Sequence, residues 1–391
     1  MSIFRTGFEN LLENPPAFMR SSRLAMLVNP ASVDRRFLPS AKVLDQKFPG
    51  RLKAVFTPQH GFFAARQDNM IESPDTTDPF LGVPAFSLYS QTRVPTDRAM
   101  ELFDTALVDI QDVGTRVYTF IYTVSYLMEA AKKHGRKVVI LDRPNPIGGE
   151  LVEGNLLAPE FVSFVGRYPI PMRHGLTMGE IARLMNEEFG IGCDLEVIPM
   201  TGWERRHYWE DTDLSWIPPS PNLPTVESTV TYPGQVIWEG TNVSEARGTT
   251  LPFTMLGAPY LEWDEVLEDL GGPEQVGAIL RPTAFEPTSN KWKGELCKGF
   301  SIHVTDREKF RPVSLAWRLL ASIYKRRPKS FAWKTPPYEY EYEKWPIDMI
   351  FGTDRARLTL EKGNDPKMFE ESWDRDERSF FETRRPYLIY R

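Results

Sequence analysis

A cluster of polar and turn-forming residues follows an apolar run in the first half of the chain. The run Lys137–Leu141 is rich in β-branched residues and predicts a buried parallel strand. It continues into Asp142-Arg143-Pro144-Asn145-Pro146 and then a pair of glycines. An acid, a guanidinium and an amide beside rigid prolines can hydrogen-bond a polar ligand and exchange protons with it. A salt-bridged structural turn is the competing interpretation, and this motif alone does not separate the two.

Similar clusters end the other apolar runs of the first half. Strands are predicted at residues 24–28, 52–56, 85–89, 105–110, 137–141 and 194–199, and helices at 120–134 and 177–189. Thr177 is expected to cap the second helix, with Glu180 at the capping-box position. Strands that alternate with helices predict an α/β fold with a doubly wound, mainly parallel sheet. Because the carboxyl ends of such strands share one edge, where ligands bind, their convergence favours a site over unrelated turns.

Composition excludes several classes of protein. The chain has 391 residues, of which 41% are hydrophobic and 26% charged, as in an ordinary globular protein of about two domains. The net charge of −6 gives no basic footprint for nucleic acid. No apolar run is long enough to predict a membrane span, and the N-terminus lacks a signal-peptide pattern, so we expect a cytoplasmic protein. Cys193 and Cys297 have no metal-ligand spacing and are expected to be buried thiols.

A proline-rich passage at residues 216–225 divides the chain. We predict one domain at 1–225 and a second at 226–391, with the passage as an ordered connector that lines the cleft between them. In the second domain we expect a strand at 235–238 that ends at Glu239 and an exposed strand at 299–306. Helices are expected at 313–324 and 366–384, and the segment 387–390 is expected to dock against a core.

Carboxylates are the richest source of chemistry in these loops. The chain has no phosphate-binding glycine loop, no nucleophile elbow and no His-Glu-x-x-His motif. Asp109, Asp112, Asp142, Glu239 and Glu245 all lie at or just after predicted strand ends. Glycoside hydrolysis needs two carboxyl groups, one to protonate the leaving oxygen and one to act as nucleophile or to activate water. Nearby arginines suit a carboxylate on the substrate. For each acid taken alone, a structural salt bridge or cap is the alternative.

Eight long motifs occur in one order over nearly the whole chain: Pro58–Phe62, Ser87–Tyr89, Asp109–Arg116, Leu141–Gly149, Arg173–Glu180, Pro219–Pro224, Tyr232–Gly234 and Glu239–Thr250. In these motifs the sequence resembles the bacterial exo-β-N-acetylmuramidase family. The resemblance implies a Rossmann-like N-terminal domain, a smaller C-terminal α/β domain and a site in the cleft between them. It also implies release of β-1,4-linked N-acetylmuramic acid from the non-reducing ends of peptidoglycan fragments.

The candidate site follows from both lines of reasoning. The candidate catalytic acids are Asp112, Asp142, Glu239 and Glu245. The candidate substrate-binding residues are Asn29, Gln59, His60, Tyr89, Arg116, Arg143, Asn145, Arg173, His174, Asn222, Asn242 and Arg247. A muropeptide or amino-sugar disaccharide is the expected substrate, and no metal, cofactor or nucleic-acid partner is expected. The sequence leaves the roles of acid, base and nucleophile open. It also does not determine the oligomeric state.

One departure from the family's pattern bears on activity. The usual motif reads Pro-Glu-His-Gly-Phe-Arg-Gly, whereas this chain has Gln59 for the glutamate and Phe63-Ala64 for Arg-Gly; Ala246 stands where glycine is usual. An amide cannot exchange a proton as a carboxyl group does. Another carboxylate can carry the chemistry, the substrate can differ, or the protein can bind sugar without hydrolysing it. Possible substitutes in the altered loop are Asp68, Glu72 and Asp75. A further alternative is hydrolysis of an ester or amide bond of a wall fragment by Ser220 and His174.

Overall fold

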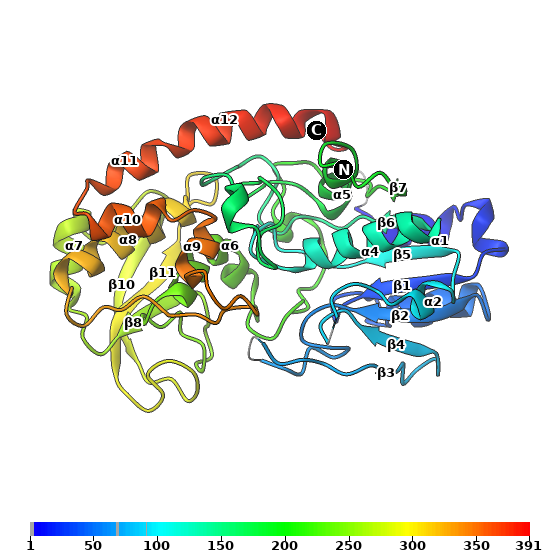
Figure 1. Ribbon diagram of the computed structural model, residues 1–391, viewed down its shortest axis with the longest axis horizontal. Helices are drawn as coiled ribbons and strands as arrows, with labels where there is room; N and C mark the ends of the chain where they lie inside the picture. Colours follow the sequence, from blue (N-terminus) through cyan, green and yellow to red (C-terminus); the bar gives the residue numbers. More distant parts are fainter. Residues whose placement is uncertain (1–3, 68–69, 91) are drawn as a thin grey trace.

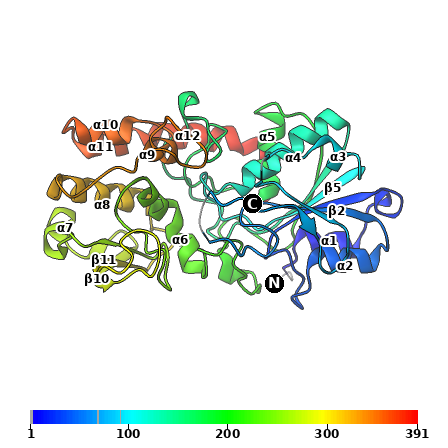
Figure 2. The same cartoon turned by 60° about the horizontal axis from the view of Figure 1, so that its bottom comes forward.

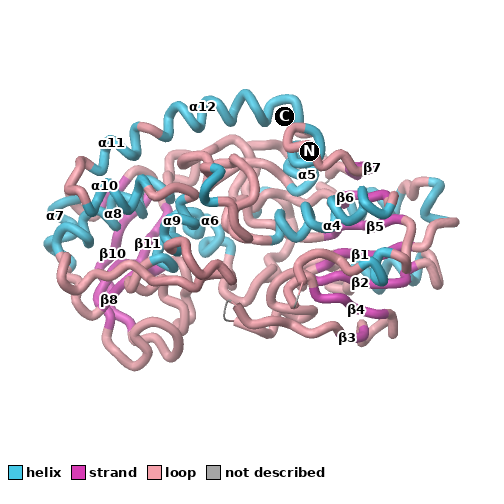
Figure 3. Tube along the Cα trace, in the orientation of Figure 1, coloured by secondary structure: helices cyan, strands magenta, loops and turns pink. Residues whose placement is uncertain are grey.

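The computed structural model describes residues 4–67, 70–90 and 92–391, and this part of the chain forms two sheets joined by long loops (Figures 1 and 3). The larger sheet has seven strands in the order β3-β4-β2-β1-β5-β6-β7, parallel throughout except for β3. This arrangement confirms the predicted α/β class. The strands are β1 (Leu24–Val28), β2 (Leu52–Thr57), β3 (Thr76–Thr77), β4 (Pro84–Ser87), β5 (Thr105–Asp109), β6 (Lys137–Leu141) and β7 (Asp194–Ile198).

Side chains of the central strands alternate between two cores. Met26 and Leu107 pack on one face, and Leu27 and Val108 pack on the other. Because both faces are covered, each strand appears in the sequence as a continuous apolar run. Figure 2 shows the helices on the two sides of the sheet. They are α1 (Gly7–Glu13) and α2 (Ser40–Lys47) on one face, and α3 (Asp97–Met100), α4 (Phe120–His134) and α5 (Met178–Glu187) on the other.

Local signals placed two of these helices, α4 and α5, correctly. Thr177 caps α5, and its side chain and that of Glu180 each accept the other residue's backbone N–H, as the capping box predicted. At the C-terminal end of α4, Gly135 adopts the left-handed conformation with φ 61°. The helix boundaries in this half therefore follow from interactions within a few residues.

The smaller sheet has four antiparallel strands in the order β8-β11-β10-β9. The predicted exposed strand at 299–306 is instead β11, which lies between two neighbours and buries Phe300 and Ile302. The strands are β8 (Met255–Ala258), β9 (Glu274–Gln275), β10 (Ala278–Phe285) and β11 (Cys297–Val304). The helices are α6 (Val226–Gln235), α7 (Trp263–Leu270), α8 (Pro312–Arg326), α9 (Pro346–Phe351), α10 (Arg355–Glu361), α11 (Pro366–Glu371) and α12 (Trp373–Arg384).

The strand predicted at 235–238 is wrong. Helix α6 runs into a 3-10 helix, η4 (Val236–Gly240), and Glu239 belongs to that turn. Val236, Ile237 and Trp238 are all buried, so the run has no polar face from which its period can be recognised. The other 3-10 helices are η1 (Ala17–Arg20), η2 (Pro159–Phe161), η3 (Trp209–Asp211) and η5 (Arg385–Tyr387).

The C-terminal segment returns to the larger sheet. The helix predicted at 366–384 is divided into α11 and α12 at Ser372, and α12 runs back across the molecule so that the two termini lie close together (Figure 1). Arg384 donates hydrogen bonds to the carbonyl groups of Gly149 and Gly175, and the hydroxyl of Tyr390 donates to Asp142. The predicted docking of the tail is therefore confirmed. Within the described ranges, no helix is long and apolar enough to cross a membrane.

Candidate functional site

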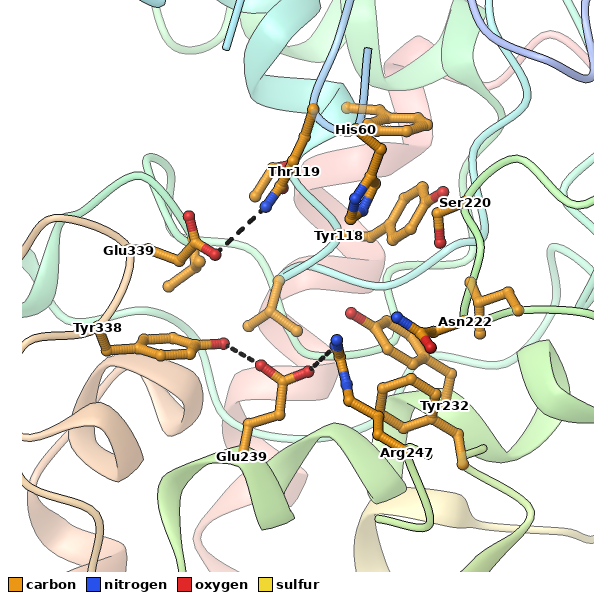
Figure 4. Close-up of a pocket in the computed structure, with 16 residues that line it drawn as sticks. His60, Tyr118, Thr119, Ser220, Asn222, Tyr232, Glu239, Arg247, Tyr338 and Glu339 are labelled. Carbon is orange, nitrogen blue, oxygen red and sulfur yellow. Dashed lines mark hydrogen bonds and ion pairs between the residues drawn. The ribbon is translucent and has the colours of Figure 1, made fainter. Parts of the chain in front are cut away.

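A pocket is lined by both parts of the chain, at the carboxyl end of β2 and the start of α4 on one side and at η4 on the other (Figure 4). The connector contributes Ser220 and Asn222. Five predicted site residues line this pocket: Gln59, His60, Asn222, Glu239 and Arg247. Further lining residues are Val117, Tyr118, Thr119, Phe120, Val165, Ser220, Leu223, Tyr232, Phe253, Tyr338 and Glu339.

Glu239 is the carboxylate at the centre of one wall. Its Oε1 lies 2.5 Å from Nη2 of Arg247, and its Oε2 accepts a hydrogen bond of 2.7 Å from the hydroxyl of Tyr338. All three side chains are buried. A cation and a hydroxyl donor on the two oxygens complement a negatively charged carboxylate and fix its plane.

Glu245 stands on the other side of Arg247. It lies 3.3 Å from Nε of Arg247 and 2.7 Å from Nζ of Lys291. Although burial opposes it, the charges of Lys291 and Arg247 hold the pKa of Glu245 below its usual value. An adjoining pocket of about 300 Å³ is lined by Glu239, Glu245, Arg247 and Lys291, so two of the four predicted acids border it.

The opposite wall is formed by Gln59 and its partners. The amide oxygen of Gln59 accepts a hydrogen bond of 2.9 Å from Thr119, and its Nε2 donates one of 3.3 Å to Glu339. The hydroxyl of Tyr89 donates to the other oxygen of Glu339 over 2.6 Å. Tyr89, which the sequence also predicted, therefore reaches the site through Glu339.

His60 is held as a neutral ring. Its Nδ1 lies 2.6 Å from the carbonyl oxygen of Arg66, which can only accept, so Nδ1 carries the proton and Nε2 is an acceptor. Burial, together with the charge of Arg247, lowers the pKa of His60 to about 4. The backbone at His60 is left-handed, with φ 77°, a strained conformation that recurs at functional sites. The ring is suited to accepting a hydrogen bond from a substrate hydroxyl.

Several predicted residues instead hold the strand ends together. Asp142 accepts hydrogen bonds from Thr177, the backbone of Gly179 and Tyr390, and burial raises its pKa to about 7. Arg143 forms a buried ion pair with Asp109 at 2.5 Å. The carboxyl ends do converge as expected, but Asp142 and Arg143 pair with other protein groups there, as most buried polar groups do. Asp142 and Arg143 are thus anchors of the loops and of the C-terminal tail.

The remaining predicted residues serve the same purpose. Arg116 donates to three backbone carbonyl groups, of Asn155, Ile170 and Ile350. Asn29 donates to the carbonyl of Gln111, Asn145 to that of Leu176, Arg173 to that of Ile147 and Asn242 to that of Ser330. His174 is fully buried 3.7 Å from Asp112, whose pKa burial raises to about 7. The described linings of the two pockets include none of Asn29, Asp112, Arg116, Asp142, Arg143, Asn145, Arg173, His174 and Asn242.

The structure also bears on the residues named as substitutes for Gln59 and on the Ser220 and His174 alternative. Asp75 accepts a hydrogen bond from the backbone of Ser87, Glu72 is exposed, and Asp68 lies outside the described residues. Within the described part of the chain, no hydrogen bond joins Ser220 to His174, whose Nδ1 accepts from the backbone of Leu176. The same part of the chain contains no group of three or more His, Cys, Asp or Glu side chains able to hold a metal ion.

The sequence analysis missed Tyr338, Glu339 and Lys291. Tyr338 and Glu339 follow two prolines in a loop far from every motif, and no periodicity or spacing distinguishes them. Their roles depend on contacts with residues 99 and 280 positions away, Glu239 and Gln59. A residue with only such distant partners gives no local signal.

A two-part α/β chain with buried carboxyl groups, tyrosines and an arginine around one pocket has the groups of a glycoside hydrolase. Residues 24–227 match the N-terminal part, and residues 230–390 the C-terminal part, of the family described as exo-β-N-acetylmuramidase NamZ. The chain belongs to this family. It is 40% identical over 386 residues to the peptidoglycan β-N-acetylmuramidase NamZ of Bacillus subtilis (strain 168), covering 99% of this chain and 91% of that protein.

Solved structures agree with this assignment. Two DUF1343 family proteins from Bacteroides fragilis NCTC 9343 are each 29% identical to this chain. The first has a TM-score of 0.89 and covers 99% of both chains. The second has a TM-score of 0.74 and covers 100% of this chain and 99% of its own. The predicted division of the chain at 225/226 stays a prediction.

Proposed function

We propose that the protein is a glycoside hydrolase that releases β-1,4-linked N-acetylmuramic acid from the non-reducing ends of peptidoglycan fragments. Membership of the family and the name of the Bacillus subtilis relative support the reaction and the substrate class. The structural observation that carries the proposal is the carboxyl group of Glu239. It is buried, lines the pocket, and is held in one orientation by Arg247 and Tyr338.

A carboxylate in this position suits the chemistry of the reaction. Hydrolysis of a glycosidic bond passes through a transition state with positive charge at the anomeric carbon. A fixed, negatively charged group stabilises that charge, and it can act as nucleophile or accept a proton from water. Arg247 and Lys291, beside the adjoining pocket, offer cations to a carboxylate of the substrate.

Product analysis tests the proposal. The protein is incubated with the disaccharide that has N-acetylmuramic acid at its non-reducing end, and free N-acetylmuramic acid is measured by mass spectrometry. The isomer with N-acetylglucosamine at that end is the substrate control and should not be cleaved. Glu239→Gln should lower turnover at least about 100-fold, the usual scale for a group that acts on the reacting atoms. Full activity in that variant would remove Glu239 from the chemistry.

Gln59 favours a second candidate, a sugar-binding protein without catalysis, because it replaces the glutamate of the family's motif. Calorimetry with the same disaccharide separates the two candidates, since binding without sugar release supports the second. Action on small fragments in the cytoplasm stays a prediction, which cell fractionation tests.

A further inference from the structure

We infer that Glu339 is the general acid of this reaction, the group that protonates the leaving oxygen. The inference rests on the proposed function and adds a catalytic residue that no motif indicated. Glu239 lines the pocket from η4 and Glu339 lines it from a turn, and Figure 4 shows both carboxyl groups facing its interior. Most glycoside hydrolases use two carboxyl groups, one on each side of the bond that is cleaved.

The backbone that presents Glu339 is strained. Tyr338 and Glu341 exchange two backbone hydrogen bonds of 3.0 Å, which makes residues 339 and 340 the centre of a tight turn. Both central residues have positive φ, 47° for Glu339 and 65° for Tyr340. Turns of this kind favour glycine and asparagine, because a larger side chain is strained at positive φ. Glutamate and tyrosine in these strained positions point to a use for their side chains.

The hydrogen bonds of Glu339 leave room for a proton. One carboxyl oxygen accepts from Nε2 of Gln59, and the other accepts from the hydroxyl of Tyr89. Each oxygen has two acceptor positions, so one bond on each still leaves a position for the acidic hydrogen. Gln59 thus positions the acid in this chain, in the place where the family's motif has a carboxyl group of its own.

The surroundings of the two glutamates differ in charge. Burial raises the pKa of Glu339 and the negative charge of Glu239 adds to this, while hydrogen bonds from Tyr89 and Gln59 and the charge of Arg93 oppose it. Glu239, by contrast, is paired directly with the guanidinium of Arg247. One carboxyl group is thus bonded directly to a cation, whereas the hydrogen bonds of the other come from the neutral groups Gln59 and Tyr89.

The step is balanced as follows. The O–H bond of Glu339 breaks and its proton bonds to the glycosidic oxygen, as the bond between that oxygen and the anomeric carbon breaks and its electron pair goes to the oxygen. Water supplies a hydroxyl group to the anomeric carbon. The second proton of water returns to a carboxylate of the pocket, so the protein regains its original number of protons.

Two substrates with different leaving groups test the assignment. The natural disaccharide needs its leaving oxygen protonated, whereas a nitrophenyl β-N-acetylmuraminide releases a phenolate without an acid. Glu339→Gln should lower kcat/KM at least about 100-fold on the disaccharide and less than about 10-fold on the nitrophenyl substrate. Glu343 is an exposed glutamate in the same loop, so Glu343→Gln is the matched control. Its kcat/KM on both substrates should equal that of the unmodified protein.

Each result is decisive. Equal losses on both substrates, or no loss on the disaccharide, overturn the assignment of Glu339. No release of N-acetylmuramic acid from either substrate by the unmodified protein overturns the proposed function instead. If Glu339→Gln does not fold, the pH profile of the unmodified protein decides. An alkaline fall in kcat/KM on the disaccharide that is absent with the nitrophenyl substrate supports Glu339, and identical profiles overturn it.

Discussion

Gln59 and Glu339, 280 positions apart in the sequence, are joined by a hydrogen bond of 3.3 Å from the amide nitrogen to a carboxyl oxygen. Gln59 follows a strand of the larger sheet, and Glu339 lies in a turn of the second half of the chain. The contact therefore joins the two halves of the chain within one wall of the pocket. It also places a carboxyl group beside the one residue of the motif that departs from the family's pattern.

Gln59→Glu tests what that departure means. The new carboxyl group would lie within hydrogen-bond distance of Glu339, and two such groups share a proton with a raised apparent pKa. If Glu339 is the acid, the alkaline limb of the pH profile should move to higher pH, and kcat/KM at neutral pH should change less than about 10-fold. A gain of about 100-fold or more would instead show that the native chain lacks an acid. Unchanged profiles for Gln59→Glu and Gln59→Ala would remove this position from the site.

Tyr338→Phe should weaken catalysis while preserving the fold. The variant removes the hydroxyl that donates to Glu239 over 2.7 Å but keeps the buried ring. Loss of a hydrogen bond to a charged group costs about 1.5–3 kcal/mol, so turnover should fall about 10-fold to 100-fold where that bond supports the transition state. Steady-state kinetics on the disaccharide measure this. A rise in KM with an unchanged kcat would show that Tyr338 only binds substrate.

Asp142→Asn should affect stability and leave turnover nearly intact. Asp142 accepts hydrogen bonds from Thr177, Gly179 and Tyr390, and an asparagine would place an N–H group against one or more of these donors. We expect a loss of about 2–4 kcal/mol in the free energy of unfolding, measured by denaturant titration. At a temperature where the variant is folded, kcat should stay within a few-fold. A loss of about 100-fold there would return Asp142 to the list of catalytic acids.

Glu153→Gln should stabilise the protein at neutral pH. Burial raises the pKa of Glu153 to about 7, while its hydrogen bond to the backbone of Ser314 works against this. In the unfolded chain it ionises near a pKa of about 4.3. Between these values the folded state binds more protons, so the free energy of unfolding falls as pH rises and levels off above about pH 7.

Glutamine keeps the acceptor for Ser314 and removes the ionisation. The variant should therefore match the unmodified protein near pH 4 and exceed its stability by about 1–3 kcal/mol at pH 8. Thermal unfolding at the two pH values provides the comparison. If the two proteins differ in stability by the same amount at both pH values, the raised pKa of Glu153 is not the cause.

The sequence by itself determined the α/β class, six of the seven strands of the larger sheet, the cap of α5 and the family. These features depend on apolar runs and on contacts within a few residues, such as that between Thr177 and Glu180. It also selected Gln59, His60, Glu239 and Arg247, which line the pocket, because long motifs surround them. The strand predicted at 235–238 was wrong, because a segment buried on every side shows no periodic pattern of apolar and polar residues.

Only the tertiary structure decided which polar groups meet. Asp142 and Arg143 are an acid and a cation at a strand end, the setting in which the sequence predicted a site, yet they are bonded to Tyr390 and Asp109 and do not line the pocket. Glu339 has no local signal at all and enters the pocket through a turn that brings it to Gln59. Most buried polar groups have a partner, and which partner is nearest depends on the paths of loops that are remote in sequence.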